Sequence, residues 1–261
     1  MESVLNHKIS ASDRQQAFEM ACRKTVAVPL WKRLLDATII LVASPVAILV
    51  GAIIAVVIKI GSPGPVIFRQ ERVGYKGQRF TCFKFRTMYA GVETSSHQGY
   101  TTTLIKSETP MTKLDASTDS RIIPLGSIMR AAGLDELPQL INVLRGEMSL
   151  VGPRPCVGYE YDMYETWQKR RFDAVPGLTG LWQVSGKNRT TFNQMINLDI
   201  EYSEQMSLWL DLKIIFKTVP ALGQQCREHL IKRKHRKAKA LLAEEAAASQ
   251  TEVSSRVKIA G

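Results

Sequence analysis

The longest uninterrupted apolar stretch covers residues 37–58, where 22 consecutive positions carry no charge. As a straight helix it would be about 33 Å long at about 1.5 Å per residue, enough to cross the hydrocarbon core of a bilayer. Ser44 and Pro45 lie in its middle, where proline removes a backbone donor and bends a helix. Basic residues flank both ends, although a spanning helix has its Lys/Arg excess on one side. The pattern therefore favours a helix-break-helix hairpin that returns to the same face over a single spanning anchor.

Asp36 lies near the start of this apolar segment, directly after Lys32 and Arg33. An acidic side chain at that depth requires a basic partner or a place at the interface. We therefore expect Asp36 to have a basic partner or to lie at the interface.

The pattern after residue 60 predicts a small, mostly helical domain. Alternating positions in 66–70 and 79–87 predict two strands, joined through the glycine-containing turn at 74–77. Residues 91–120 are rich in Ser and Thr and lack periodicity, which predicts a surface loop or lid. Helical periodicity extends over 124–132, 135–145, 158–171, 192–206 and 208–222. The expected fold class is α+β, mostly helical, with an N-terminal re-entrant membrane helix hairpin and a small cytoplasmic domain that contains a short β-hairpin.

The charge distribution points to anionic partners. The net charge is +11, and residues 227–240 alone hold seven Lys/Arg against one Glu. This basic run begins a tail that becomes rich in Ala and Glu, which predicts either a helix on the membrane surface or a largely disordered segment. The four cysteines are widely scattered with no C-x-x-C pair, so a zinc site or a disulfide framework is not expected.

The densest chemical signal is the run from Leu134 to Gln139. Pro138 is tolerated only in the first turn of a helix, which places Asp135 and Glu136 at a helix N-terminus, where the backbone favours anions. Gly133 suits the C-terminal cap of the preceding helix. An Asp-Glu pair at a helix start is most often a cap alone, so its neighbours decide whether it is a site.

Four cations are candidates for the same place. Arg154 lies between two prolines that stiffen its backbone, and the strand over 79–87 presents two cations on one face. The predicted phosphate-binding set is Lys84, Arg86, Arg130 and Arg154. Two acids among basic residues suit phosphoryl transfer with Mg²⁺, because one carboxylate can attack phosphorus while the other helps to hold the metal. Asp135 and Glu136 are therefore both the catalytic and the metal-binding candidates.

These motifs resemble those of the bacterial sugar transferase family, the monotopic polyprenyl-phosphate phosphoglycosyltransferases. The resemblance extends over about residues 30–220. The matching stretches are Lys32-Arg33 with Asp36 and Ser44-Pro45, Gly64-Pro65 through Gly74, Phe83 to Met88, Asp135 to Gln139, Val151 to Pro155 and Pro176 to Gln183.

The resemblance implies a specific reaction. Asp135 would displace UMP from a UDP-sugar to give an aspartyl-phosphosugar, with Glu136 assisting and Mg²⁺ required. Undecaprenyl phosphate would then attack this intermediate, as the first membrane step of exopolysaccharide, capsule or O-antigen assembly. Residues matching Lys84, Arg130 and Arg154 would lie near the phosphates, and the membrane helix would break at Ser44-Pro45. Similarity around 176–187 to hexose-phosphate transferases suggests glucose or galactose as the sugar.

The resulting organisation has four parts: a polar segment over 1–29, a re-entrant membrane helix over 30–60, a catalytic domain over 61–222 and a tail over 223–261. The expected location is the cytoplasmic face of the inner membrane, without a nucleic-acid partner, and a homo-oligomer remains open. The alternative is a membrane-anchored scaffold or nucleic-acid-binding protein, supported only by the basic run at 227–240. No Asp-x-Asp glycosyltransferase motif and no P-loop is found in the sequence.

Overall fold

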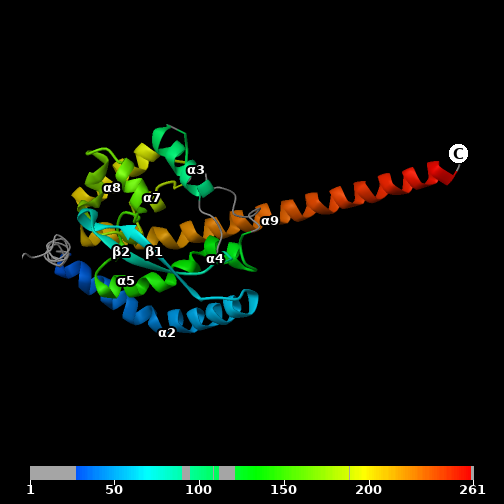
Figure 1. Cartoon of the computed structure of the whole chain (residues 1–261). Coiled ribbons are helices and arrows are strands. Elements are labelled where there is room, and N and C mark those ends of the chain that lie inside the picture. Colours follow the sequence, from blue (N-terminus) through cyan, green and yellow to red (C-terminus); the bar gives the residue numbers. More distant parts are fainter. Residues whose placement is uncertain (1–27, 90–94, 108, 112–120, 188, 260–261) are drawn as a thin grey trace, which may run out of the picture.

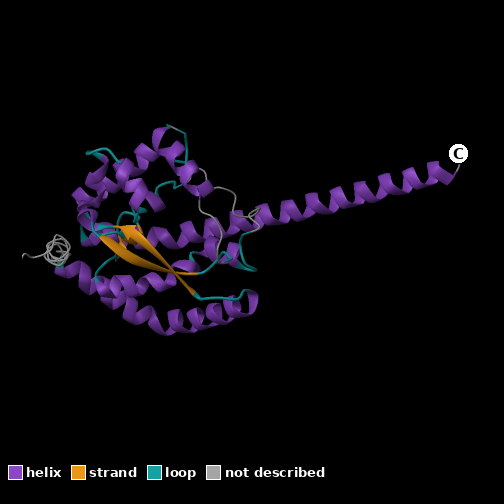
Figure 2. Ribbon diagram, viewed as in Figure 1, coloured by secondary structure: helices purple, strands orange, loops and turns teal. Residues whose placement is uncertain are grey.

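The computed structural model describes residues 28–89, 95–107, 109–111, 121–187 and 189–259. The predicted polar segment over 1–29 lies almost entirely outside these residues. Within them the chain is mostly helical, as predicted, with a small β-hairpin (Figure 2).

The first described element is a long apolar helix, α2 (Leu30–Gly61). Its length and composition are sufficient to cross a membrane, and it is the one helix in the described ranges that meets this test. Many of its large apolar side chains are mostly uncovered by the protein: Leu34, Leu41, Val42, Val46, Leu49, Ile53 and Val56 are all more than half exposed. The core helix of a soluble protein buries such residues, so α2 is built for an apolar surrounding.

The predicted break at Ser44-Pro45 is not an interruption of the helix. The residues of α2 remain helical throughout, with Pro45 inside, and the helix bows along the body of the protein (Figure 1). The Ser44 hydroxyl donates a hydrogen bond to the carbonyl of Leu41 at 2.9 Å, and such a bond often bends a helix. The helix accommodates proline by bending, because the missing N–H costs one hydrogen bond and not the whole turn.

Both halves of α2 pack against the same body. Ile40, in the first half, is buried against Cys82 and Met148. Ile58, in the second half, is fully buried against a cluster that includes Phe85 and Met129. The helix thus lies along the domain over its length.

The predicted hairpin is confirmed. β1 (Ile67–Val73) and β2 (Arg79–Phe85) pair antiparallel and are joined through the turn η1 (Tyr75–Gly77). Two three-residue strands, β3 (Ser149–Val151) and β4 (Gly177–Thr179), form a separate parallel pair. The sequence analysis missed this pair, because three residues are too few to show a periodicity.

The remaining helices surround these strands. They are α3 (Ser95–Lys106), α4 (Gly126–Ala132), η2 (Leu134–Gln139), α5 (Leu140–Arg145), α6 (Gly158–Met163), η3 (Gln168–Asp173), α7 (Leu181–Val184), α8 (Phe192–Gln205) and α9 (Leu208–Ile259). The helices predicted over 124–132 and 192–206 are found close to the expected bounds, whereas the helix predicted over 208–222 begins where expected but continues to Ile259. Gly133, with φ of 70°, forms the predicted left-handed cap of α4.

Three expectations need correction. The segment over 91–120 is not only a loop, because it contains α3, and Ile105 packs against the core cluster next to α8. The predicted helix over 158–171 is two short helices, α6 and η3. Between them the side chain of Gln168 accepts a hydrogen bond from the Glu165 N–H at 2.8 Å, which starts a new turn in place of the old helix. The helix over 135–145 begins as the 3-10 turn η2 and becomes α5.

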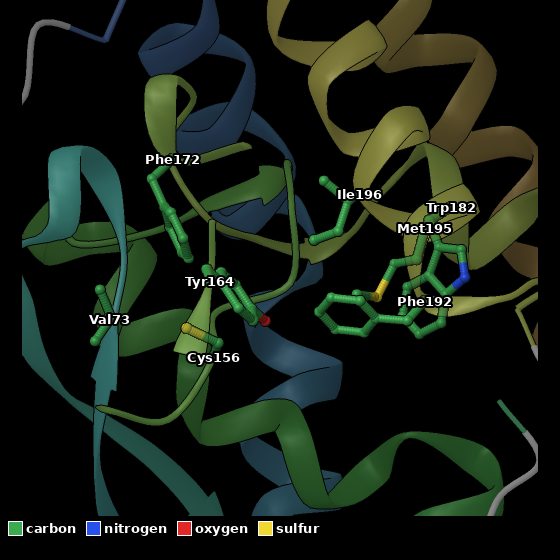
Figure 3. Close-up of a cluster of buried hydrophobic side chains, with 8 residues drawn as sticks. All are labelled: Val73, Cys156, Tyr164, Phe172, Trp182, Phe192, Met195 and Ile196. Carbon is green, nitrogen blue, oxygen red and sulfur yellow. The ribbon is translucent and has the colours of Figure 1, made fainter. Parts of the chain in front are cut away.

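The largest core cluster holds the helices over 158–205 to the hairpin. Its members come from β1, the segment after β3, the C-terminal cap of α6, η3, α7 and α8: Val73, Cys156, Tyr164, Phe172, Trp182, Phe192, Met195 and Ile196 (Figure 3). The tail is helical in the structure: α9 continues through Pro220 to Ile259 and projects away from the body (Figure 1). Its expected place on the membrane surface stays a prediction.

Candidate functional site

Lys84, Asp135, Glu136 and Arg154 meet where β2 packs against η2. Lys84 comes from β2, the two acids from the first turn of η2, and Arg154 from the segment after β3. Phe85, the next residue along β2, is buried in the cluster that Leu134 and Leu137 of η2 also contact. Alternation along the strand therefore points Lys84 away from that cluster. Apolar packing on one side of each element brings the charged groups together on the other.

Glu136 is held by two cations. Its Oε1 lies 3.1 Å from Lys84 Nζ and 2.6 Å from Arg154 Nη2. The Arg154 Nη1 also donates to Oε2 at 3.5 Å, a distance at the limit for a hydrogen bond. The side chains of Lys84 and Glu136 are each 17% exposed, whereas that of Arg154 is 34% exposed. The cluster is thus half-buried, with Arg154 at its open side.

Asp135 differs from its neighbour. Its carboxylate is partly buried and has no hydrogen-bond or ion-pair partner among the described residues. Burial raises the pKa of Asp135, and the charge of Glu136 raises it further against the opposing effect of Lys84, Arg154 and Arg130. The Asp135 carboxylate is therefore available to a ligand.

The pKa of Glu136 is shifted in the opposite direction to that of Asp135. Burial alone would raise the pKa of Glu136, but Arg154 and Lys84 hold that pKa well below its usual range. Burial lowers the pKa of Lys84, and Glu136 opposes this shift. The Glu136 charge raises the pKa of Arg154. Two adjacent carboxyl groups thus have different environments, one fixed as an anion by cations and one unpaired, a separation that is typical of catalytic sites.

The other two predicted cations, Arg130 and Arg86, form no ion pair with Glu136 in the described part of the chain. Arg130, in the last turn of α4, acts electrostatically on Asp135. Arg86 is not part of the cluster. Its guanidinium is buried and donates to the carbonyls of Pro63 at 2.6 Å and Ser62 at 2.9 Å. β2 ends at Phe85, so the alternation that orients Lys84 no longer applies, and Arg86 instead holds the connection between α2 and β1.

Arg72 is a cation near the site that the predicted set did not include. It lies on β1, and its charge acts on Lys84, as does that of Arg154. Its guanidinium donates to Gln70 Oε1 at 2.6 and 3.1 Å and to the carbonyl of Pro155 at 3.3 Å. The signal was present in the sequence, because Arg72 belongs to the stretch from Gly64 to Gly74 that carries the family resemblance, but no spacing linked it to Arg154.

The segment that carries Arg154 begins where β3 and β4 approach very closely. A Cβ added at Gly152 would lie 2.1 Å from the carbonyl oxygen of Val175, and one added at Gly177 would lie 2.1 Å from the Gly152 nitrogen. Only glycine fits at such a contact. The close approach sets where the Pro153-Arg154-Pro155 segment leaves the strand.

The acids were also predicted to bind Mg²⁺. The described residues contain no group of three or more side chains of the kind that forms a complete metal cage. Mg²⁺ is commonly held by one or two carboxylates together with substrate phosphates and water. Asp135, with its unpaired oxygens, fits that pattern, whereas Glu136 would share its oxygens with Lys84 and Arg154.

A second buried polar group joins the membrane helix to the domain. Lys32 of α2 pairs with Asp211 of α9 and donates to the Tyr202 hydroxyl of α8 at 2.8 Å. Asp36, expected to have a basic partner or to lie at the interface, accepts a hydrogen bond from the backbone N–H of Leu150 at 3.0 Å, and the charge of Lys32 acts on it electrostatically. These contacts place the start of α2 against the body that carries the site.

The arrangement combines an unpaired carboxylate, a neighbouring acid fixed by cations and a membrane-length apolar helix. This combination defines a membrane-associated enzyme that acts on an anionic substrate. The chain matches the model of the bacterial sugar transferase family over residues 27–225. It belongs to that family and is a transferase, as its motifs predict.

Curated relatives support the same assignment. The chain is 37% identical to the exopolysaccharide production protein ExoY of Sinorhizobium fredii over 195 residues, which is 73% of this chain and 84% of the relative. It is 42% identical to the UDP-glucose:undecaprenyl-phosphate glucose-1-phosphate transferase of Caulobacter vibrioides over 76% of this chain and 71% of that protein. It is 40% identical to the undecaprenyl-phosphate galactose phosphotransferase of Salmonella typhimurium over 59% of this chain and 33% of that protein.

Proposed function

We propose that this protein transfers a hexose-1-phosphate, glucose or galactose, from a UDP-sugar to undecaprenyl phosphate in exopolysaccharide, capsule or O-antigen synthesis. Family membership supports the class of reaction, and the names of the Caulobacter and Salmonella relatives support the lipid and the sugars. The observation that carries the proposal is the unpaired Asp135 carboxylate beside a Glu136 that two cations fix.

The reaction proceeds in two displacement steps at the same phosphorus. An Asp135 oxygen attacks the phosphorus that bears the sugar, and the bond to the bridging oxygen breaks, so that UMP leaves with the electron pair. A phosphate oxygen of undecaprenyl phosphate then attacks the same phosphorus and releases the Asp135 carboxylate. One phosphoanhydride replaces another. Arg154 and Lys84 bind phosphate oxygens, and Glu136 keeps these two cations in place between substrates. Mg²⁺, held by Asp135 and substrate oxygens with Glu136 beside it, would neutralise charge on the phosphates.

Asp135→Asn tests the nucleophile. The amide keeps the shape of the side chain but cannot form the acyl phosphate, so UMP release should fall to background while the thermal unfolding curve stays unchanged. In the wild type, a UDP-sugar with label in the sugar should leave label on the protein when the lipid is omitted. Asp173→Asn is the matched control, because Asp173 is exposed and pairs only with Lys76 at the surface. Turnover near wild type in Asp135→Asn would exclude this nucleophile.

Each nucleotide-sugar candidate can be compared directly. UDP-glucose and UDP-galactose, supplied with undecaprenyl phosphate, should give UMP at clearly different kcat/KM, because a pocket that hydrogen-bonds one hydroxyl orientation rejects the other. A protein that releases UMP from neither would refute the choice of hexose.

We further propose that α2 is re-entrant and that both its ends face the cytoplasm. Ile40 and Ile58, at opposite halves of α2, are buried against the same body, and basic residues flank both ends. A helix that crossed the bilayer away from the body would leave one half without these contacts. A re-entrant helix also keeps Asp135 on the side of the UDP-sugar pool.

Single cysteines test this topology. They are introduced at positions 24 and 69 in a cysteine-free background, and intact cells are treated with an impermeant maleimide. Protection of both positions until the cells are lysed is the expected result. Labelling at position 24 but not at position 69 in intact cells would show a true span.

A further inference from the structure

The segment that carries Arg154 depends on its carbonyl oxygens for attachment. Pro153 and Pro155 have no backbone N–H, so the segment has fewer donors to offer to a sheet. Each of its three carbonyls has a partner instead. Pro153 accepts from the Gly177 N–H at 2.9 Å, Arg154 accepts from Arg171 Nη2 at 2.9 Å, and Pro155 accepts from Arg72 Nη1 at 3.3 Å.

Two of these three donors are guanidinium groups from distant parts of the chain. Arg171 lies on η3 and Arg72 on β1, and they hold adjacent carbonyls of the one segment. The Arg154 side chain between them projects to Glu136 with Nη2 at 2.6 Å. The backbone of Arg154 is therefore held by other arginines, while its own guanidinium faces the site.

Arg171 is itself fixed. Its side chain is 2% exposed and forms an ion pair with Asp199 of α8, with 2.6 Å between Nη2 and Oδ2. It also donates to the Tyr164 hydroxyl at 3.1 Å, and Tyr164 belongs to the core cluster in Figure 3. A guanidinium so constrained has little freedom to release the Arg154 carbonyl.

Arg72 is placed at an electrostatic cost. Burial and the nearby charge of Arg154 both lower the pKa of Arg72. Among the described residues Arg72 forms no ion pair, and its donors go to the Gln70 amide oxygen and the Pro155 carbonyl. A neutral donor would satisfy the same carbonyl without repelling Arg154. A cation here also adds positive charge beside a site that binds a diphosphate.

We propose that Arg72 and Arg171 are positioning residues that clamp the Pro153-Arg154-Pro155 segment and so aim the Arg154 guanidinium at the substrate phosphates. The inference rests on the proposed function, because it takes Arg154 as a phosphate-binding residue. A displacement of about 1 Å in a substrate-positioning group can lower activity by about 100-fold. The clamp therefore controls transfer without touching the substrate.

A double-mutant cycle on kcat/KM for the UDP-sugar tests the clamp. Arg72→Met is the principal variant, because removing a cation that pairs with no carboxylate leaves no buried anion behind. It should lower kcat/KM by about 10- to 100-fold. In an Arg154→Ala background the same change should have an effect within about twofold, because the group that it positions is gone. In an Arg130→Ala background, Arg72→Met should lower kcat/KM by the same factor as in the wild type, because Arg154 is still present.

Arg171→Lys tests the second arm. It keeps a cation beside Asp199 but loses the guanidinium fork, so kcat/KM should fall in the wild-type background and change little in the Arg154→Ala background. Arg79→Met is the matched control for Arg72→Met, since Arg79 lies on the same hairpin as Arg72 but is 58% exposed and pairs with Glu71. Its kcat/KM should equal that of the wild type. If Arg171→Lys fails to fold, the Arg72 cycle decides the outcome.

Binding of UDP alone, measured by calorimetry, distinguishes a failure of the proposed function from a failure of the clamp. A wild type that neither binds UDP nor releases UMP would refute the proposed function. The clamp would be refuted if the wild type binds UDP and releases UMP but Arg72→Met lowers kcat/KM by the same factor with and without Arg154→Ala. Arg72 would then be an independent binding residue. A Tm lowered in Arg72→Met with kcat/KM per folded molecule unchanged would also overturn the clamp.

Discussion

Removing the carboxylate of Asp211 should strongly destabilise the attachment of α2. Lys32 is 1% exposed and Asp211 is fully buried, and the pair joins the start of α2 to the start of α9. Asp211→Ala leaves the Lys32 ammonium buried, with the Tyr202 hydroxyl, 2.8 Å away, as its remaining hydrogen-bond partner among the described residues. Loss of one partner from a buried ion pair typically costs about 3–5 kcal/mol.

The expected shift is large enough to measure. For a domain of this size each kcal/mol lowers Tm by about 2–4 °C, so Asp211→Ala should lower Tm by about 6–20 °C. Circular dichroism in detergent micelles, at matched heating rates, measures the change. Glu204→Ala is the control, because the Arg170–Glu204 pair is 58% and 55% exposed. Such a pair contributes at most about 1 kcal/mol.

The double variant distinguishes a buried charge from lost packing. Lys32→Met combined with Asp211→Leu removes both charges and keeps apolar volume, so it should recover most of the lost Tm. A double variant as unstable as Asp211→Ala would mean that the pair contributes through specific geometry. Asp211→Ala with a Tm within about 2 °C of wild type would refute the reasoning altogether.

Four other outcomes follow from particular contacts. Ile58→Ala removes a fully buried side chain and should lower the free energy of unfolding by about 2–5 kcal/mol in chemical denaturation. Arg86→Met should lower Tm but leave the KM for the UDP-sugar unchanged; a raised KM with unchanged Tm would return Arg86 to the phosphate-binding set. Gly152→Ala should reduce both soluble yield and activity, since its Cβ would lie 2.1 Å from the Val175 carbonyl oxygen. Truncation after residue 226 should retain UMP release, and complete loss of UMP release with the fold intact would show that transfer depends on the tail.

Local sequence was sufficient for the elements that depend on their own residues. The uncharged stretch over 37–58 makes a long apolar helix wherever it lies, and alternation with a glycine turn makes the hairpin of β1 and β2. Pro138 and the preceding Gly133 confine Asp135 and Glu136 to the first turn of a helix. These features are set by backbone sterics and by periodicity within a few residues.

The partners of each charge were decided by tertiary structure. Lys84 and Arg86 occupy alternate positions of one strand in the sequence, yet Lys84 meets Glu136 and Arg86 meets the carbonyls of Ser62 and Pro63. The strand ends between them, and what surrounds each side chain comes from segments far away in the chain. A period-two pattern predicts the face of a strand but not the group that lies opposite.

The buried ion pairs show the same limit most clearly. Lys32 and Asp211 are 179 residues apart, and nothing local marks them as partners. A buried charge must be compensated, because desolvation costs several kcal/mol, but the sequence determines only that a partner is needed. For Asp36 the hydrogen-bond donor is the backbone N–H of Leu150, 114 residues away, which nothing local in the sequence marks. The amino-acid sequence thus determined the helices, the hairpin and the acidic pair, while the packing of α2, β1, η2 and η3 decided which charges form the site, because compensation depends on distances that only the folded chain sets.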